Sequence, residues 1–280
     1  MNRCISAAAL CFLGSITPAF GAVDSSWDWK DCCRNLYFNF TGVGTVYDMD
    51  TIKIGQGPNN QQLTMKNAFI SAVDIWNNAQ TNAAKKWNLK FGAPIENCPQ
   101  INVQLGAVEF EDQPTDANNV PRFKSRMKSI GQQAEDPAWQ PGGGNGAGPQ
   151  DALAFFRRNM TGNVATSGAI YFNPQALWGL AGLNSFDPII LALHEIGHAM
   201  KLLDLPGTVN MDPWIGSVMT GTFDAGIHQA NPIGLDTRLP SAADIADAET
   251  ACAECVPAPG VLAPALAALG FGAIRRRRAA

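Results

Sequence analysis

The chain has 280 residues, and 46% of them are hydrophobic, which is enough apolar material for a packed core in one large domain or two small ones. Its formal net charge at pH 7 is −4, but the two ends of the chain hold five of the 20 basic residues and none of the 24 acidic ones. Without those ends the chain has 15 basic and 24 acidic residues, a net charge of −9, and no electrostatic reason to bind nucleic acid.

The first 21 residues have the pattern of a secretory signal peptide. An early Arg3 precedes the apolar run AAALCFLGSI, and Ala19 and Gly21 are small residues at alternate positions, a spacing that suits signal peptidase. The segment is too short to span a bilayer, and a buried core helix is the weaker interpretation. We expect signal peptidase to remove residues 1–21 and a globular domain to occupy residues 22–256.

The next part of the chain predicts alternating strands and helices. Alternation of apolar residues predicts strands at residues 36–45, 101–105 and 168–172. Apolar residues at helical spacing predict a long amphipathic helix at residues 65–87. Near the end of the domain, Ser241 and Asp244 nearly match a capping box and predict a further helix. This order is typical of an α+β domain.

Residues 111–150 are rich in Asp, Pro, Asn and Gly, and we expect them to form a long surface excursion. Asp112 and Asp116 are a weak candidate for a structural Ca²⁺ site, because isolated acids in a loop are usually only solvated. The glycine run at residues 141–150 lacks the Gly-Lys-Ser/Thr ending of a phosphate-binding loop.

The run IILALHEIGHAMKLL has the length and pattern of a helix, with Pro188 in its first turn. It contains His194 and His198, two of the three histidines of the chain. Residues four apart on a helix have Cβ atoms about 5–6 Å apart on one face, so both imidazoles can bind one Zn²⁺ ion. Glu195 would be the general base for a zinc-activated water that attacks a carbonyl. Two exposed histidines without a metal are the weaker alternative.

These residues resemble the extended motif of the metzincins, zinc endopeptidases with H-E-x-x-H-x-x-G-x-x-H or, in a minority such as the snapalysins, a final Asp. His194, Glu195, His198 and Asp204 align with ligand, base, ligand and third ligand. Lys201 stands where the family has a glycine that turns the chain back toward the metal. A non-glycine residue in that conformation costs on the order of 1 kcal/mol, against roughly 10 kcal/mol or more from structural zinc binding.

Two other residues are alternatives to Asp204 as the third ligand. His228 is the remaining histidine of the chain and lies in a turn-rich stretch, and Glu249 could approach from the last helix. The metzincin resemblance ranks Asp204 first, His228 second and Glu249 third. The segment GSVMTG supports it, because metzincins place a methionine turn below the zinc, and Met219 fits that position.

The resemblance is closest to the matrixin-type catalytic domain, and it implies a mainly parallel sheet, an active-site helix and a C-terminal helix. It also implies that residues 167–173 form the sheet edge beside the cleft, where an extended protein or peptide substrate adds as an antiparallel strand. Selectivity would come from pocket walls within residues 216–235. The propeptide cysteine of the matrixins has no counterpart in its usual Pro-Arg-Cys-Gly setting.

Five cysteines remain after the signal peptide is removed, and in an exported protein they should mostly form disulfides. An odd number leaves at least one thiol unpaired or intermolecular. For the Cys252-x-x-Cys255 pair, a structural bridge is favoured over a redox pair or half of a zinc site.

The last segment, residues 257–280, contains Pro257 and Pro259, an apolar run at residues 261–274 and four arginines at residues 275–278. It resembles the PEP-CTERM sorting tail of exopolysaccharide-producing Gram-negative bacteria, with Ala258 in place of the usual glutamate. The resemblance implies transient membrane contact, removal by an exosortase-like enzyme, and release to the cell surface or extracellular matrix. A short membrane anchor is the alternative.

Together these patterns predict an exported zinc metalloendopeptidase. The alternatives are a noncatalytic surface or matrix protein that keeps the fold, and a zinc hydrolase that acts on a non-peptide amide.

Overall fold

The computed structural model describes residues 23–32, 34–57, 60–95, 98–108, 153–180, 186–204, 217–219 and 239–254, with residues 115, 117–118, 120 and 122–123 between them. The predicted signal peptide and sorting tail, the calcium candidates Asp112 and Asp116, and His228 lie outside these residues. Within the described ranges, no helix has the length and apolar character needed to cross a membrane.

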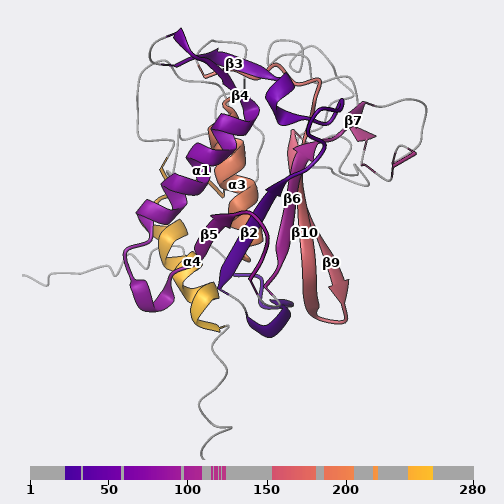
Figure 1. Cartoon of the computed structure of the whole chain (residues 1–280). Helices are drawn as coiled ribbons and strands as arrows, with labels where there is room; N and C mark the ends of the chain where they lie inside the picture. The colour runs from indigo at the N-terminus through magenta and orange to yellow at the C-terminus, as the bar shows by residue number, and fades with distance from the viewer. Residues whose placement is uncertain are drawn as a thin grey trace, which may run out of the picture.

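A six-stranded sheet runs along one flank of the helices (Figure 1). Neighbouring strands are parallel, except that β9 (Ala154–Thr161) is antiparallel to β10 (Val164–Phe172). The short β1 (Asp28–Trp29) adds a parallel pairing at the start of β10. The predicted α+β class and the mainly parallel sheet are confirmed. The spatial order of the other strands is β5 (Asn88–Phe91), β2 (Asn35–Phe40), β6 (Gln100–Leu105), β10 (Val164–Phe172) and β9 (Ala154–Thr161).

The prediction that residues 167–173 form the sheet edge is wrong. β6 pairs with β10 on one side, from Ser167 opposite Gln100 to Phe172 opposite Leu105, and β9 pairs with it on the other. Among the described strands, β9 therefore forms this edge. Its sequence AFFRRNMT ends in a run of exposed residues, so it lacks the apolar alternation that marks a half-buried strand.

Helix α1 (Met65–Ala79) ends eight residues before the predicted end. Gln80 is extended, and its side-chain oxygen accepts a hydrogen bond from the backbone N–H of Trp87 at 2.9 Å. The chain therefore leaves the helical path, and the short 3-10 helix η4 (Ala83–Lys85) follows. The indole of Trp87 is buried and donates to the Ala248 carbonyl at 2.8 Å.

Strand β2 also ends early, at Phe40 and not at residue 45. Gly42 and Gly44 have φ values of 73° and 74°, in the left-handed region that glycine enters at little cost. The chain turns there instead of continuing the strand.

Two predicted helix starts are confirmed. Asp187 caps α3 (Pro188–Ala199), and its carboxylate accepts from the Ile189 N–H at 2.9 Å, with proline in the first turn. Before α4 (Ala242–Glu254), the Ser241 N–H donates to Asp244 at 2.8 Å and the Asp244 N–H donates to the Ser241 hydroxyl at 3.1 Å. This reciprocal pair is the predicted capping box.

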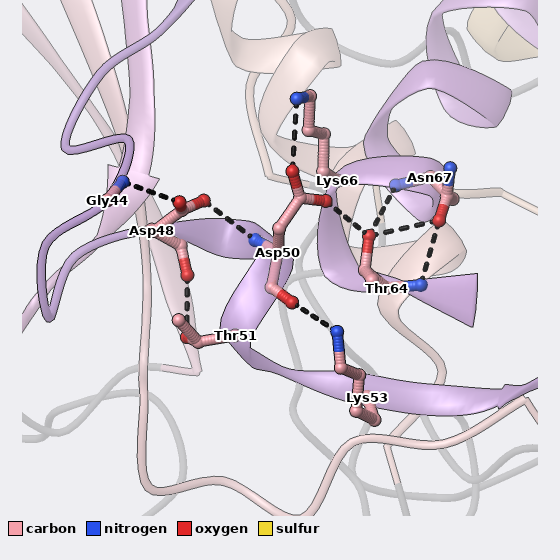
Figure 2. A network of polar contacts seen from close by, with 8 residues as sticks. All are labelled: Gly44, Asp48, Asp50, Thr51, Lys53, Thr64, Lys66 and Asn67. Atoms are coloured by element: carbon pink, nitrogen blue, oxygen red, sulfur yellow. Dashed lines mark hydrogen bonds and ion pairs between the residues drawn. The ribbon is translucent and has the colours of Figure 1, made fainter. Parts of the chain in front are cut away.

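A polar network surrounds the start of α1 (Figure 2). Asp48 caps the 3-10 helix η2 (Met49–Thr51) and accepts from the backbone N–H groups of Gly44 at 2.7 Å and Asp50 at 2.9 Å. Asp50 accepts from the Thr64 hydroxyl at 2.8 Å and pairs with Lys66 at 3.1 Å. The network joins the turn after β2 to the helix.

The remaining small elements are η1 (Lys30–Cys32), the antiparallel pair β3 (Lys53–Gln56) and β4 (Gln62–Thr64), and the parallel pair β7 (Ala107–Val108) and β8 (Arg122–Phe123).

The hydrophobic core lies between the sheet and the helices. Aromatic side chains from the sheet and from α1 meet edge to face, as Phe38 and Phe172 do with Phe69. The buried indole of Trp76 donates to the Leu193 carbonyl at 2.9 Å. That bond fixes α1 against α3 one residue before His194.

The cysteines divide between a bonded and a free state. Cys98 is disulfide-bonded. Cys252 is a free thiol, fully buried on α4, so the predicted Cys252–Cys255 bridge is wrong. The cause is the direction of the side chain, because the helix turns Cys252 into the core. The prediction of at least one unpaired thiol is confirmed.

Candidate metal centre

The structure brings together three of the residues that the sequence singled out. His194 and His198 lie on α3, and Asp204 follows the helix after a bend. The Asp204 Oδ1 atom lies 3.2 Å from His194 Nε2 and 3.3 Å from His198 Nε2, and the two Nε2 atoms are 3.1 Å apart. One atom from each side chain is thus directed at a common point, and these are the only three residues so grouped in the described part of the chain.

The other nitrogen of each imidazole is bonded to a backbone carbonyl. His194 Nδ1 lies 2.9 Å from the Val218 oxygen, and His198 Nδ1 lies 2.8 Å from the Leu202 oxygen. A carbonyl oxygen can only accept, so each Nδ1 carries the proton and donates it. In the neutral rings, both Nε2 lone pairs therefore face the common point, as metal coordination requires.

The bend after α3 has the hydrogen bonds of a Schellman motif. Leu202 N–H donates to the Gly197 carbonyl at 3.0 Å, and Lys201 N–H donates to the His198 carbonyl at 2.9 Å. Lys201 has a φ of 72°, in the left-handed region usually occupied by glycine at this position. Lys201 thus adopts the conformation that the family has with glycine, and the bend returns Asp204 to the two histidines.

Glu195 lies beside this group and is 1% exposed. The backbone N–H of Phe156 on β9 donates to its carboxylate, while its Oε2 atom has no hydrogen-bond partner. Burial raises the pKa of the Glu195 carboxyl, the charge of Asp204 adds to that effect, and the two histidines oppose it. A buried carboxylate oxygen without a partner is costly unless a water or an ion meets it.

Asp204 and the two histidines shift one another's pKa values. Burial raises the pKa of the Asp204 carboxyl, but hydrogen bonds from His194 and His198 and their charges more than offset it and hold that pKa far below its usual range. Burial lowers the pKa of His198, but the bond to Asp204 and the charges of Glu195 and Asp204 outweigh it and raise that pKa to about 9. The two opposite pKa shifts have the same origin, the contact between His198 and Asp204.

The centre opens to solvent on one side. The side chain of His194 is 5% exposed and that of His198 is 23% exposed, whereas that of Asp204 is 56% exposed. A group bound among the three would thus be enclosed by α3 and accessible from the side of Asp204.

Met219 packs against α3, the helix that carries both histidines. A Cβ atom on Gly197 would come within 2.2 Å of the Met219 sulfur, so the thioether packs directly on the backbone of α3. Asp244 fixes this segment, since its carboxylate accepts from the Ser217 hydroxyl at 2.5 Å and from the Val218 N–H at 3.0 Å. α4 is thereby connected through Val218 to the ring of His194.

Of the two alternative third ligands, the described part of the chain includes only Glu249. Glu249 lies on α4 and, in the described part of the chain, is not among the residues that converge. His228 and the calcium candidates lie outside the described residues. The sequence pointed to Asp244 only as a helix cap and gave no signal for Val218, because a backbone carbonyl has no residue type to recognise.

No protein-family model matches this sequence, and neither does any curated protein.

Proposed function

We propose that the protein is a zinc-dependent metalloendopeptidase of the metzincin type, with His194, His198 and Asp204 as the metal ligands. The observation that carries the proposal is the meeting of two imidazole Nε2 atoms and one carboxylate oxygen beside a buried glutamate. The bend at Lys201 and the packing of Met219 on Gly197 also support the metzincin type.

The donor set fits Zn²⁺. Two neutral imidazoles and one carboxylate are ligands that Zn²⁺ binds in proteins, and three protein ligands leave a fourth position free, as in catalytic zinc sites. The unpartnered Oε2 of Glu195 supports this assignment, because a water at such a position would satisfy it.

Bound zinc supplies Lewis acidity that lowers the pKa of water and polarises a carbonyl group. Glu195 then acts as the proton carrier: its carboxylate takes the proton of the attacking water and delivers it to the nitrogen of the leaving amine. Burial raises the pKa of the Glu195 carboxyl, which makes its carboxylate a stronger base for the proton of the water. The Phe156 N–H keeps its carboxylate oriented.

Substrate would bind along β9. In the described part of the chain β9 pairs only with β10, and we propose that an extended peptide adds along its other edge. Since Phe156 of this strand contacts Glu195, a peptide that lies along β9 passes beside the proposed base.

Export by the signal peptide and release through the sorting tail complete the proposal, with the cell surface or extracellular matrix as the place of action. A noncatalytic protein that retains the fold is the second candidate, favoured by the lysine at residue 201.

The experiment measures zinc content by elemental analysis and cleavage of casein and gelatin with and without a chelator. We expect stoichiometric zinc and chelator-sensitive cleavage. The variant Glu195→Gln should keep zinc and lose most turnover, whereas Glu249→Gln, the same change on α4, should keep both. Stoichiometric zinc without cleavage of any protein would favour the noncatalytic candidate, and cleavage of small amides alone would indicate a non-peptide substrate.

A further inference from the structure

Lys201 is buried in the bend between two of the proposed metal ligands. Its side chain is 1% exposed, and its backbone has a φ of 72°. Both features are unusual for lysine, which is almost never fully buried unless paired and has no intrinsic preference for the left-handed region. A glycine would adopt this left-handed conformation at lower cost. The presence of a lysine therefore needs a reason in the contacts of its side chain.

The ammonium group of Lys201 joins two distant parts of the chain. Its Nζ atom donates to Asp28 Oδ1 on β1 at 2.6 Å and lies 3.7 Å from Glu254 Oε2, at the end of α4. It also lies 6.0 Å from the centroid of the Trp27 ring. The two carboxylates are 47% and 44% exposed, so the buried cation meets partners that remain hydrated.

The backbone around Lys201 is held by the same N-terminal segment, residues 23–29, which we call the N-terminal brace. The Asp24 N–H donates to the Lys201 carbonyl at 2.8 Å, and Val23 forms an antiparallel bridge with Leu202. The Trp29 indole donates to the Ala199 carbonyl at 2.9 Å. The brace thus runs along residues 199–202, on both sides of the left-handed residue.

The brace contacts residues that position two of the proposed ligands, His198 and Asp204. Leu202, which pairs with Val23, supplies the carbonyl that accepts from His198 Nδ1 and so sets the direction of that ring. Lys201 sets the turn that returns the chain to Asp204. A change in the brace would therefore move a ligand or alter its orientation, not only loosen the core.

We propose that Lys201 is a positioning residue of the metal centre, and that the N-terminal brace, through Asp28, is a required part of that centre. The inference rests on the metal site of the proposed function. Lys201 and Asp28 touch neither metal nor substrate. They hold the bend in the one conformation that presents Asp204 and His198 together.

The test is a Co²⁺ titration of the full chain, which reports affinity and, through the visible d–d absorption band, the coordination geometry. Asp28→Asn keeps the lysine and removes its charged partner, Lys201→Met removes the ammonium at similar length, and Lys201→Gly also removes the left-handed strain. Lys66→Met is the matched control, because it breaks the half-buried pair between Lys66 on α1 and Asp50 on η2 (Figure 2). Circular dichroism establishes which variants fold.

We expect Asp28→Asn, Lys201→Met and Lys201→Gly to weaken Co²⁺ binding by at least about tenfold and to change the absorption band at saturating metal, as loss of outer partners of metal ligands does. Lys66→Met should bind as the wild type does. If the lysine variants do not fold, the Co²⁺ affinity and absorption band of Asp28→Asn decide the test. Wild-type affinity and an unchanged band in the folded variants would overturn this inference and leave the proposed function intact. A wild-type chain that binds no Co²⁺ would instead overturn the proposed function.

Discussion

The Nδ1 atom of His194 donates to the carbonyl oxygen of Val218 at 2.9 Å, which joins α3 to the segment that carries Met219. The Val218 N–H is bound in turn by the buried carboxylate of Asp244 on α4. The orientation of one proposed ligand therefore depends on a residue of the last helix, 50 positions after it in the sequence.

This relationship predicts the effect of Asp244→Asn. The amide keeps one acceptor oxygen, so it cannot serve Ser217, Val218 and Ser241 together as the carboxylate does. We expect a loss of about 1–3 kcal/mol in the free energy of unfolding and a loss of about tenfold or more in zinc affinity. Urea unfolding and a zinc competition titration measure these quantities. Unchanged zinc affinity together with reduced stability would limit Asp244 to a helix cap.

A second prediction concerns the contact between Gly197 and Met219. Alanine at a helix interior is favoured over glycine by about 1 kcal/mol, but the new Cβ would come within 2.2 Å of the Met219 sulfur in a buried site. Overpacking of this kind costs about 1–3 kcal/mol, so Gly197→Ala should destabilise the protein on balance. Met219→Ala alone should also destabilise it by opening a cavity.

The double variant Gly197→Ala/Met219→Ala separates the two effects. We expect its loss of unfolding free energy to be smaller than the sum of the single losses, because the truncated side chain makes room for the new methyl group. Additive losses in urea unfolding would mean that the two side chains do not share this space.

A third prediction concerns Asp48 and pH. Backbone hydrogen bonds from Gly44 and Asp50 hold the pKa of the Asp48 carboxyl below its ordinary value of 3.8. A pKa that is lower in the folded state stabilises the protein above the unfolded pKa, and this stabilisation is lost as the pH falls through the folded pKa. At pH 7, Asp48→Ala should cost about 1 kcal/mol as the loss of an N-cap.

Unfolding free energies of both proteins at pH 7 and in acid provide the measurement. The difference between wild type and Asp48→Ala should shrink as the pH falls below 3.8. A difference that stays constant into strong acid would show that the hydrogen bonds do not depend on the charge of Asp48.

The sequence predicted best those structural features that are determined by neighbouring residues. The helix start at Pro188, the capping box at Ser241 and the spacing of His194 and His198 each involve residues within one turn, and the structure contains all of these local features. The resemblance also pointed to residue 201 as the site of the bend, and Lys201 is left-handed there. Local geometry decides these features, so neighbouring residues were sufficient.

The errors and omissions concern contacts that are distant in the chain. The sheet edge was misplaced because β9 has no apolar alternation, although β10 holds it along its whole length. Lys201 pairs with Asp28 across 173 positions, and Asp244 binds Val218 across 26. Patterns of neighbouring residues carry no information about such pairs, so the support of the site became visible only in the fold.

The central claim is that Asp204 completes a metal site with His194 and His198. The most direct test is the zinc content of the purified wild-type chain and of Asp204→Ala and His228→Ala, measured by elemental analysis after dialysis. We expect one zinc ion per chain in the wild type and in His228→Ala, and loss of zinc in Asp204→Ala. A wild-type chain without zinc, or zinc that survives in Asp204→Ala and disappears in His228→Ala, would contradict the claim.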